Sequence, residues 1–433
     1  MRSLAWLSLL GICTSISCGA RSSLRDLLAG EEDDPSGGGG NGATTTSTTG
    51  ATTTGGEGGG IPTGECGVVE LTDYALTPLV LDGTTISTVE MTKAAASPTM
   101  VCAAGRIQEQ APSAHYGGLC FDAFGTWPTA LDQPTPLIGS SVGQIRLAPG
   151  LPDGIAILTG ANGDVAAPAA RYNPAWLPGR PPQWSEFPFD GEIVPTFITP
   201  AGDTHIAGLA LGDTFETWLS VSTLVSSPAD FVGAACAQGP LVADGLYHDG
   251  NVLVAAASGA SVTGCLVEPI IIARRLQVAD WTFGGFRPPV LLLDEEMPAV
   301  IDDVAIADAG SSVWVAALVQ NEVYAVRLSK SGGVEVPLTS VGTTVGGMSI
   351  AMRGDELLIA TIDWTDPDLA ADVIVHEISP DGAVGSFGSF DTNGAAWVSD
   401  LALVVSDDQL HAVVGYHTGP GQLAARRFDC VTE

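Results

Sequence analysis

A strand–turn–strand pattern that recurs along the chain constrains its fold more than any other feature. The stretch IDDVAIADAGSSVWVAA (301–317) aligns without gaps with VGGMSIAMRGDELLIAT (345–361) and with VSDLALVVSDDQLHAVV (398–414). In each copy an alternating apolar strand leads into a polar turn, and a second apolar strand follows. Alternation with a period of two, broken by turn residues, predicts a β-hairpin. A hairpin that recurs along a chain predicts a repeat architecture.

The second strand of this hairpin can be followed through the whole region 66–433. It begins at Met100, Ile155, Thr204, Val252, Val313, Leu357 and Leu410, at spacings of about 40 to 60 residues. Third strands are expected at 270–276, 323–328, 373–378 and 423–428, and a weaker fourth strand at 334–338. Repeated units of four antiparallel strands resemble a β-propeller. The resemblance implies an all-β, seven-bladed propeller over residues 66–433, with six or eight blades as the alternatives.

The composition agrees with an all-β protein and limits its partners. The chain has 54 glycines and 28 prolines, and only 15% of its residues are charged, which favours strands and turns over helices. Its 16 Lys and Arg residues against 49 Asp and Glu residues give a net charge of −33. Such a charge argues against binding of nucleic acid or of an anionic bilayer by the folded region. An acidic extracellular surface is expected, or else one that collects cations or basic partners.

The first 18 residues predict export. They hold a short charged start, an apolar core and an exit of small residues before Cys18, which is the anatomy of a signal peptide. The sequence SISC at 15–18 resembles the lipobox of bacterial lipoproteins, although Ser15 stands where an aliphatic residue is usual. The resemblance implies a lipid on Cys18, with ordinary signal cleavage as the alternative. It also implies a protein held at the cell envelope, and Gly19 favours the outer membrane of a Gram-negative bacterium.

Residues 19–65 are expected to form a tether. The segment is rich in Gly, Ser and Thr and has almost no apolar side chains to bury, so it predicts disorder. A flexible segment of this kind would hold the folded region 66–433 away from a membrane and let it turn freely.

The cysteines predict disulfides. Six of the eight lie in 66–433, and export leads to an oxidising compartment. The chain ends after a third strand, while the apolar stretch at 66–71 belongs to no unit, so pairing the two would close a ring. A Cys66–Cys430 disulfide would lock that closure. We favour it together with Cys102–Cys120 and Cys236–Cys265.

Loops on the functional face of a propeller supply the candidate binding residues. These are the loops that lead into the first strand of each unit and those that join its second strand to its third, and loops on a rigid scaffold are where binding residues concentrate. The candidates are Arg106, His115, Tyr116, Asp302, Asp303, Trp364, Asp366, Asp368, Trp397, Asp400, Tyr416 and His417. Trp364 and Trp397 suit the stacking of a sugar ring.

No sequence motif identifies a catalytic or cofactor site. The chain lacks a G-x-S-x-G elbow, an H-E-x-x-H zinc motif and a phosphate-binding glycine loop. The carboxylate-rich run at 362–368 predicts either a solvated acidic loop or a Ca²⁺ site, and no other cofactor is expected. Asp303 and Asp400 occupy equivalent positions in two units, either as acceptors for backbone N–H groups or as a catalytic pair.

Two functional hypotheses follow. The leading one is a non-catalytic binding or scaffolding module, a monomer attached to the membrane by its lipid, with a protein or glycan ligand. The rival is a propeller hydrolase or lyase that acts on glycans, with carboxylates such as Asp302, Asp303, Asp366 or Asp400 as acid and base. Convergence of two of these carboxylates at about 5 to 10 Å in a pocket with aromatic walls would favour the enzyme, and carboxylates spread over separate loops would count against it.

Overall fold

The computed structural model describes parts of residues 67–429, with gaps of which the longest are 76–87, 131–141 and 258–273. All described residues belong to one compact unit, Gly37–Glu433. They form strands and turns, and none of them belongs to a helix long and apolar enough to cross a membrane.

The described strands form seven antiparallel sheets, which we call blades 1 to 7 in chain order. Blade 1 holds β2 (Thr88–Ala96), β3 (Val101–Gln108), β4 (Ala114–Phe121) and β5 (Thr129–Ala130). Blade 2 holds β6 (Val142–Pro149), β7 (Ile155–Ala161), β8 (Ala169–Trp176) and β9 (Ser185–Pro188). Blade 3 holds β10 (Glu192–Ala201), β11 (Thr204–Gly212), β12 (Glu216–Thr223) and β13 (Phe231–Gln238).

Blade 4 differs from the others because its outer strand is in two pieces that both pair with the third strand. It holds β14 (Val242–His248), β15 (Asn251–Ala257), β16 (Arg274–Thr282), β17 (Gly285–Phe286) and β18 (Val290–Glu295). Blade 5 holds β19 (Ile301–Ala309), β20 (Ser312–Val319), β21 (Glu322–Ser329) and β22 (Val334–Thr343). Blade 6 holds β23 (Ser349–Arg353), β24 (Glu356–Asp363), β25 (Asp372–Ile378) and β26 (Val384–Asp391). Blade 7 holds β27 (Val398–Ser406), β28 (Gln409–Tyr416), β29 (Gln422–Asp429) and β1 (Gly67–Ala75).

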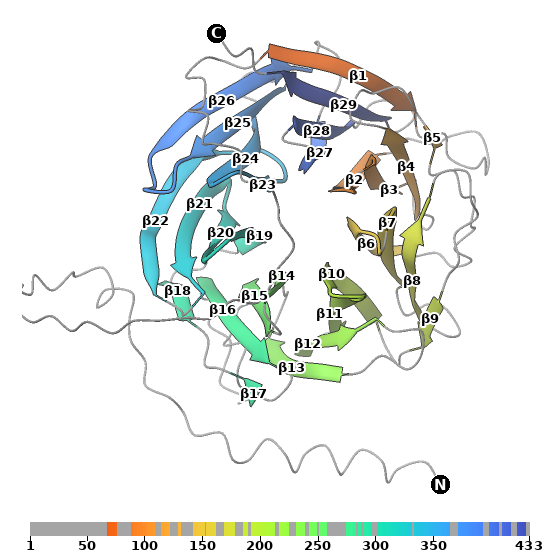
Figure 1. Ribbon diagram of the computed structural model, residues 1–433, viewed down its shortest axis with the longest axis vertical. Coiled ribbons are helices and arrows are strands. Elements are labelled where there is room, and N and C mark those ends of the chain that lie inside the picture. The colour runs from red at the N-terminus through yellow and green to blue at the C-terminus, as the bar shows by residue number, and fades with distance from the viewer. Residues whose placement is uncertain are drawn as a thin grey trace, which may run out of the picture. The chain divides into compact units, whose positions relative to one another are not determined.

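The blades follow one another around a common axis. The first strand of each blade contacts the first strand of the next, from β2 through β6, β10, β14, β19 and β23 to β27, and β27 contacts β2. Figure 1 shows the resulting ring, with the first strands innermost. The prediction of an all-β propeller is confirmed.

The ring closes where the two ends of the folded region pair. Strand β1 is the outer strand of blade 7, and its register with β29 begins at Gly67–Asp429 and ends at Ala75–Gln422. The sequence predicted this pairing of head and tail. Cys66 and Cys430 come one residue beyond the pair Gly67–Asp429 but lie outside the described residues.

The hydrophobic core is a series of layers between neighbouring blades. Strand β20 shows why, because all eight of its residues are buried. Trp314, Ala316 and Leu318 pack on blade 6, and the alternate residues turn to the opposite face of the sheet. A strand that is buried on both faces reads as a continuous apolar run, which is why the second strands stand out in the sequence.

One predicted disulfide is present and one predicted strand is misplaced. Cys102 and Cys120 lie opposite each other on β3 and β4 and form a disulfide. The third strand of blade 4, predicted at 270–276, instead runs from Arg274 to Thr282. Cys265, the signal peptide 1–18 with Cys18, and the tether 19–65 lie outside the described residues, as does the side chain of Cys236 on β13.

Candidate functional site

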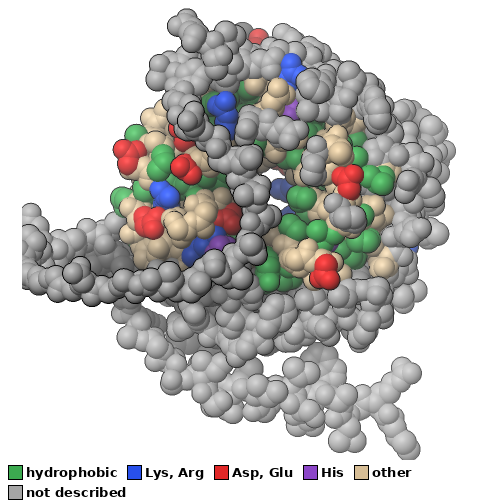
Figure 2. All heavy atoms as spheres, in the orientation of Figure 1, with side chains coloured by type: hydrophobic (Ala, Val, Ile, Leu, Met, Phe, Trp, Pro, Cys, Tyr) green, Lys and Arg blue, Asp and Glu red, His purple; other side chains and the backbone are tan. Residues whose placement is uncertain are grey.

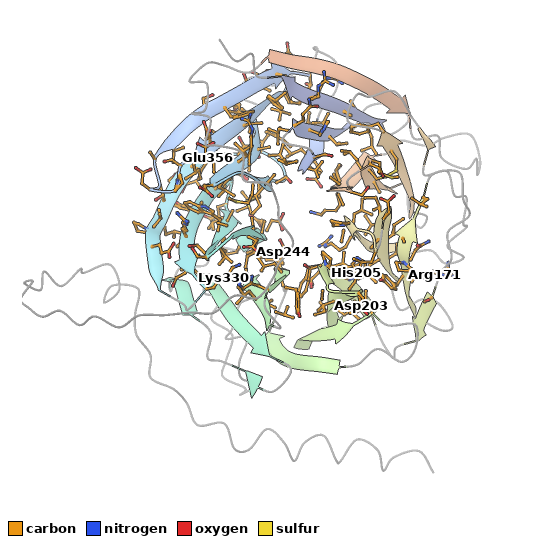
Figure 3. The ribbon with its side chains drawn as sticks, in the orientation of Figure 1. Arg171, Asp203, His205, Asp244, Lys330 and Glu356 are labelled. Atoms are coloured by element: carbon orange, nitrogen blue, oxygen red, sulfur yellow. A yellow bond between two sulfur atoms is a disulfide. The ribbon has the colours of Figure 1, made fainter. Side chains whose placement is uncertain are left out.

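The first strands of five blades carry charged side chains that lie near the axis of the ring. They are Lys93 of β2, Arg146 of β6, Asp244 of β14, Asp303 of β19 and Asp400 of β27. All five are half-buried. Figure 3 shows Asp244 on the inner side of blade 4, and Figure 2 shows Lys or Arg side chains within the opening at the middle. We call these five residues the central charged group.

Electrostatic interactions connect the central charged group across the ring. The positive charge of Lys93 acts on both Asp244 and Asp400, although blades 1 and 4 are not neighbours. Arg146 also acts on Asp244, and Asp303 acts on Asp400. Side chains from blades that do not touch can interact in this way only through the middle of the ring.

Each aspartate of the group also accepts hydrogen bonds from backbone N–H groups. Asp244, Asp303 and Asp400 each accept the N–H of the residue that follows, at 2.8, 2.9 and 2.8 Å. Asp244 further accepts the N–H of Ile306 in blade 5 at 3.0 Å, and Asp400 accepts that of Thr92 in blade 1. These bonds join neighbouring blades and fix the direction of the carboxyl groups.

Gly347 leaves room for the carboxyl group of Asp400. In the ungapped repeat it occupies the position of Asp303 and Asp400, and blade 6, to which it leads, lies between their blades. A Cβ on Gly347 would lie 2.1 Å from Oδ1 of Asp400, so the carboxyl group fills the space that a side chain here would take.

Thr344 holds the backbone that carries Gly347. Its buried hydroxyl accepts the N–H of Ile362 at 3.0 Å and donates to the carbonyl of Gly347, with an Oγ1 to O distance of 3.2 Å. Because a buried hydroxyl with both partners is costly to disturb, the backbone path into β23 is well defined.

Burial raises the pKa values of two aspartates in the group. It raises the pKa of Asp400 to about 6, with the negative charge of Asp303 adding to the rise and Lys93 opposing it. It raises the pKa of Asp244 to about 6 as well, against the N–H groups of Ile306 and Gly245 and the charges of Arg146 and Lys93. A carboxyl group in partly desolvated surroundings keeps its proton to a higher pH than one in water.

This arrangement is suited to acid–base chemistry. Asp400 can donate a proton up to a pH of about 6, and Asp303 supplies a second carboxyl group whose charge acts on it. Lys93 adds a positive charge that can stabilise an anion. A carboxyl group with a raised pKa that interacts with a second carboxyl group and with a cation is a general pattern of acid–base sites.

The other residues that the sequence singled out are spread over the molecule. Arg106, His115 and Tyr116 were predicted in loops, but they lie in β3 and β4, where Arg106 pairs with Tyr116. Asp302 and Asp303 lie in β19 rather than in a loop before it, and Asp302 is exposed.

Two of the remaining candidates lie in strands and five are not described. Asp400 lies in β27 and Tyr416 ends β28, so neither belongs to the predicted loops. Trp364, Asp366, Asp368, Trp397 and His417 lie outside the described residues. From the predicted set, Asp303 and Asp400 belong to the central charged group.

The carboxylate-rich run continues as a row of aspartates on blade 6. Asp363, Asp372 and Asp391 stand opposite one another on β24, β25 and β26, and burial together with the charges of the other two raises the pKa of Asp372. In the described part of the chain no group of three or more His, Cys, Asp or Glu side chains is arranged to hold a metal ion. Asp366 and Asp368 lie outside that part, so the Ca²⁺ hypothesis stays a prediction.

Sequence reasoning missed Lys93, Arg146 and Asp244. Each lies in a first strand, and β2 and β6 contain register shifts between Glu90 and Lys93 and between Val142 and Ile145. These shifts interrupt the alternation from which strands were read. One signal was present, because Lys93 and Lys330 are the only lysines in the sequence.

His205 of β11 is a structural residue. The fully buried ring lies between blades 2 and 3, with Nε2 2.7 Å from the carbonyl of Pro149 and Nδ1 2.7 Å from the hydroxyl of Tyr172. Since a carbonyl can only accept, Nε2 carries the proton and Nδ1 accepts from Tyr172. Burial lowers the pKa of His205, against the opposing effect of the Pro149 carbonyl.

Comparisons with known proteins agree with this fold. No protein-family model matches the chain, and no curated protein matches it in sequence. The polysaccharide lyase Uly1 has a similar structure, with a TM-score of 0.53 and 10% identity over 80% of this chain and 91% of the lyase. The likeness is one of fold.

Two other known structures are similar to this chain with lower TM-scores. An α-L-arabinanase of Penicillium chrysogenum has a TM-score of 0.45 and 8% identity over 80% of this chain and 99% of that one. A sialidase of Trypanosoma rangeli has a TM-score of 0.46 and 9% identity over 83% of this chain and 60% of that one.

Proposed function

We propose that the protein is a glycan-cleaving enzyme whose acid–base site is the central charged group. Asp400 acts as the acid that protonates the departing glycosidic oxygen, and Asp303 acts as the base. The observation that carries this proposal is the Asp400 carboxyl group in the space beside Gly347, where burial and the charge of Asp303 raise its pKa to about 6.

The choice of glycans as substrates has two supports. Cleavage of a glycosidic bond commonly uses two carboxyl groups, one as acid and one as base or nucleophile, and needs no cofactor. The similar structure with the highest TM-score reported above is a polysaccharide lyase. The expected lipid on Cys18 and the tether 19–65 fit this role, since they would hold the propeller at the cell envelope, where extracellular polysaccharides are met.

A screen of purified protein against neutral and acidic polysaccharides tests the proposal. Hydrolysis releases new reducing ends, whereas elimination also creates an unsaturated product that absorbs ultraviolet light. Asp303→Asn should lower the rate by about 100-fold or more, in the range for loss of an acid or base. Asp302→Asn is the matched control, because this exposed neighbour makes the same change in net charge. Equal rates in the two variants would refute the assignment of Asp303.

A second function is favoured by a specific observation. All three central aspartates use an oxygen to accept backbone N–H groups, and two of them join neighbouring blades. This is the role expected if the propeller is a non-catalytic binding module. In that case a glycan or protein would bind to the protein, no product would form, and Asp303→Asn would alter stability more than binding.

A further inference from the structure

Lys93 differs from the other lysine of the chain in its surroundings. Lys330 donates from Nζ to Asp308 Oδ1 at 2.7 Å and lies 2.8 Å from Nδ1 of His248, so its charge is balanced. Lys93 makes no hydrogen bond and no ion pair within 4 Å with any residue that the structure describes. The residue is half-buried, and its charge acts on Asp244 and Asp400 only from a distance.

The charge balance at the axis changes sign near pH 6. Lys93 and Arg146 contribute two positive charges and Asp303 one negative charge, while Asp244 and Asp400 each lose a proton at about pH 6. The central charged group therefore has a net charge of about +1 below that pH and about −1 above it. Below about pH 6 the group is thus a local exception in a chain whose net charge at pH 7 is −33.

We propose that Lys93 binds an anionic group of the substrate, so that the site takes an acidic polysaccharide rather than a neutral one. The proposal rests on the function proposed above. A half-buried lysine without a close partner among the described residues attracts an anion more strongly than an exposed lysine does, since the surrounding protein lowers the effective dielectric constant. The repulsion by the rest of the surface is screened over roughly 8 Å at physiological ionic strength.

Binding at Lys93 also affects the acid. The charge of Lys93 lowers the pKa of Asp400, and an anion on the ammonium group would cancel that effect. Asp400 would then keep its proton to a higher pH when an acidic substrate is bound than when the site is empty. Linkage requires that the protein take up protons on binding at a pH close to 6.

Isothermal titration calorimetry with two matched pairs of polymers tests this inference. Polygalacturonate and its fully methyl-esterified form differ in the sugar carboxylate, and dextran sulfate and dextran differ in a sulfate. We expect the wild-type protein to bind a charged member at least about tenfold more tightly than its neutral partner. Repeating the titration at pH 6 in buffers of different ionisation enthalpy measures the proton uptake.

Variants of the two lysines locate the effect. Lys93→Met should weaken binding of the charged polymer by at least about tenfold and leave the neutral polymer unaffected, and Lys93→Arg should restore most of the affinity. Lys330→Met removes the same charge from another part of the ring and should change neither affinity. Equal binding of the charged polymer by Lys93→Met and wild type would overturn the inference.

Other outcomes are decisive as well. Cleavage of a neutral glycan without binding of either acidic polymer would refute the role of Lys93 and leave the proposed function standing. Neither binding nor cleavage of any polymer would refute both. If Lys93→Met does not fold, the wild-type protein decides, because acidic polymers that bind without proton uptake would contradict the proposed coupling of Lys93 to Asp400.

Discussion

Gly347 and Asp400 share one space: a Cβ on the glycine would lie 2.1 Å from Oδ1 of the aspartate. The relationship joins the segment that leads into blade 6 to the first strand of blade 7. The missing side chain at position 347 thus makes room for the Asp400 carboxyl group, on which the charge of Asp303 in blade 5 also acts.

Substitution of Gly347 should displace the carboxyl group of Asp400. Gly347→Ala would push the carboxyl group of Asp400 out of its place, lowering the rate of glycan cleavage by at least about tenfold and the unfolding free energy by about 1–3 kcal/mol. Gly385→Ala is the matched control, because its Cβ would meet only the Glu377 carbonyl, at 3.9 Å. Kinetics and urea unfolding of both variants check this, and full activity in Gly347→Ala would contradict it.

Replacement of Asp400 by asparagine should stabilise the protein at neutral pH. The folded-state pKa of Asp400 is raised from 3.8 to about 6, so the carboxyl group favours folding below pH 3.8, and this contribution is lost as pH rises through 6. Asparagine keeps an oxygen to accept the N–H of Leu401 and carries no charge. Asp400→Asn should therefore gain up to about 3 kcal/mol at pH 7, less whatever solvation the half-buried carboxylate retains.

Urea unfolding of wild type and Asp400→Asn between pH 4 and pH 7 measures this effect. The stability difference should be small at pH 4 and grow until about pH 6. A variant that is less stable than wild type at every pH would show that the carboxylate form of Asp400 is the one the fold prefers.

Loss of the Tyr172 hydroxyl should lower the stability of the protein, because that hydroxyl donates to the buried ring of His205. Tyr172→Phe leaves Nδ1 of His205 without its donor in a buried site, which costs about 1–3 kcal/mol. Because burial lowers the pKa of His205, the unfolded state binds more protons below pH 6.5, and wild-type stability should fall as pH decreases from there. Thermal unfolding at pH 5 and pH 7.5 checks both points, and a Tyr172→Phe variant as stable as wild type would be inconsistent with them.

Ring closure should depend on a disulfide that remains a prediction. Gly67 pairs with Asp429, so Cys66 and Cys430 follow at the end of a formed ladder. Peptide mapping without reduction should recover the two in one cross-linked peptide, and Cys66→Ser should lower the unfolding free energy by several kcal/mol, since the bond closes a very long loop. Free thiols at both positions would refute it.

The strand pattern could be predicted because of how a propeller buries its strands. All seven predicted starts of second strands lie within one residue of the start of a strand, from β3 at Val101 to β28 at Gln409, because these strands are apolar on both faces. The third strand of blade 4 was predicted a few residues too early. The apolar residues at 270–273 gave a stronger strand pattern than the alternating residues of β16.

The central charged group could be predicted only in part. Asp303 and Asp400 were found because the ungapped repeat put them in register, although register shifts after Ile301 and Val398 made their strands resemble loops. Lys93 and Asp244 lie in units that do not align with that repeat. Their meeting depends on closure of the ring, which brings together residues from blades that are not neighbours.

The pH–rate profile of glycan cleavage by wild type and Asp400→Asn tests the central claim most directly. The account predicts that the wild-type rate falls as pH rises above about 6, where Asp400 loses its proton, and that Asp400→Asn is slower by about 100-fold or more and lacks this limb. An Asp400→Asn variant that cleaves glycans at the wild-type rate with the same profile, or a wild-type protein that cleaves none, would contradict it.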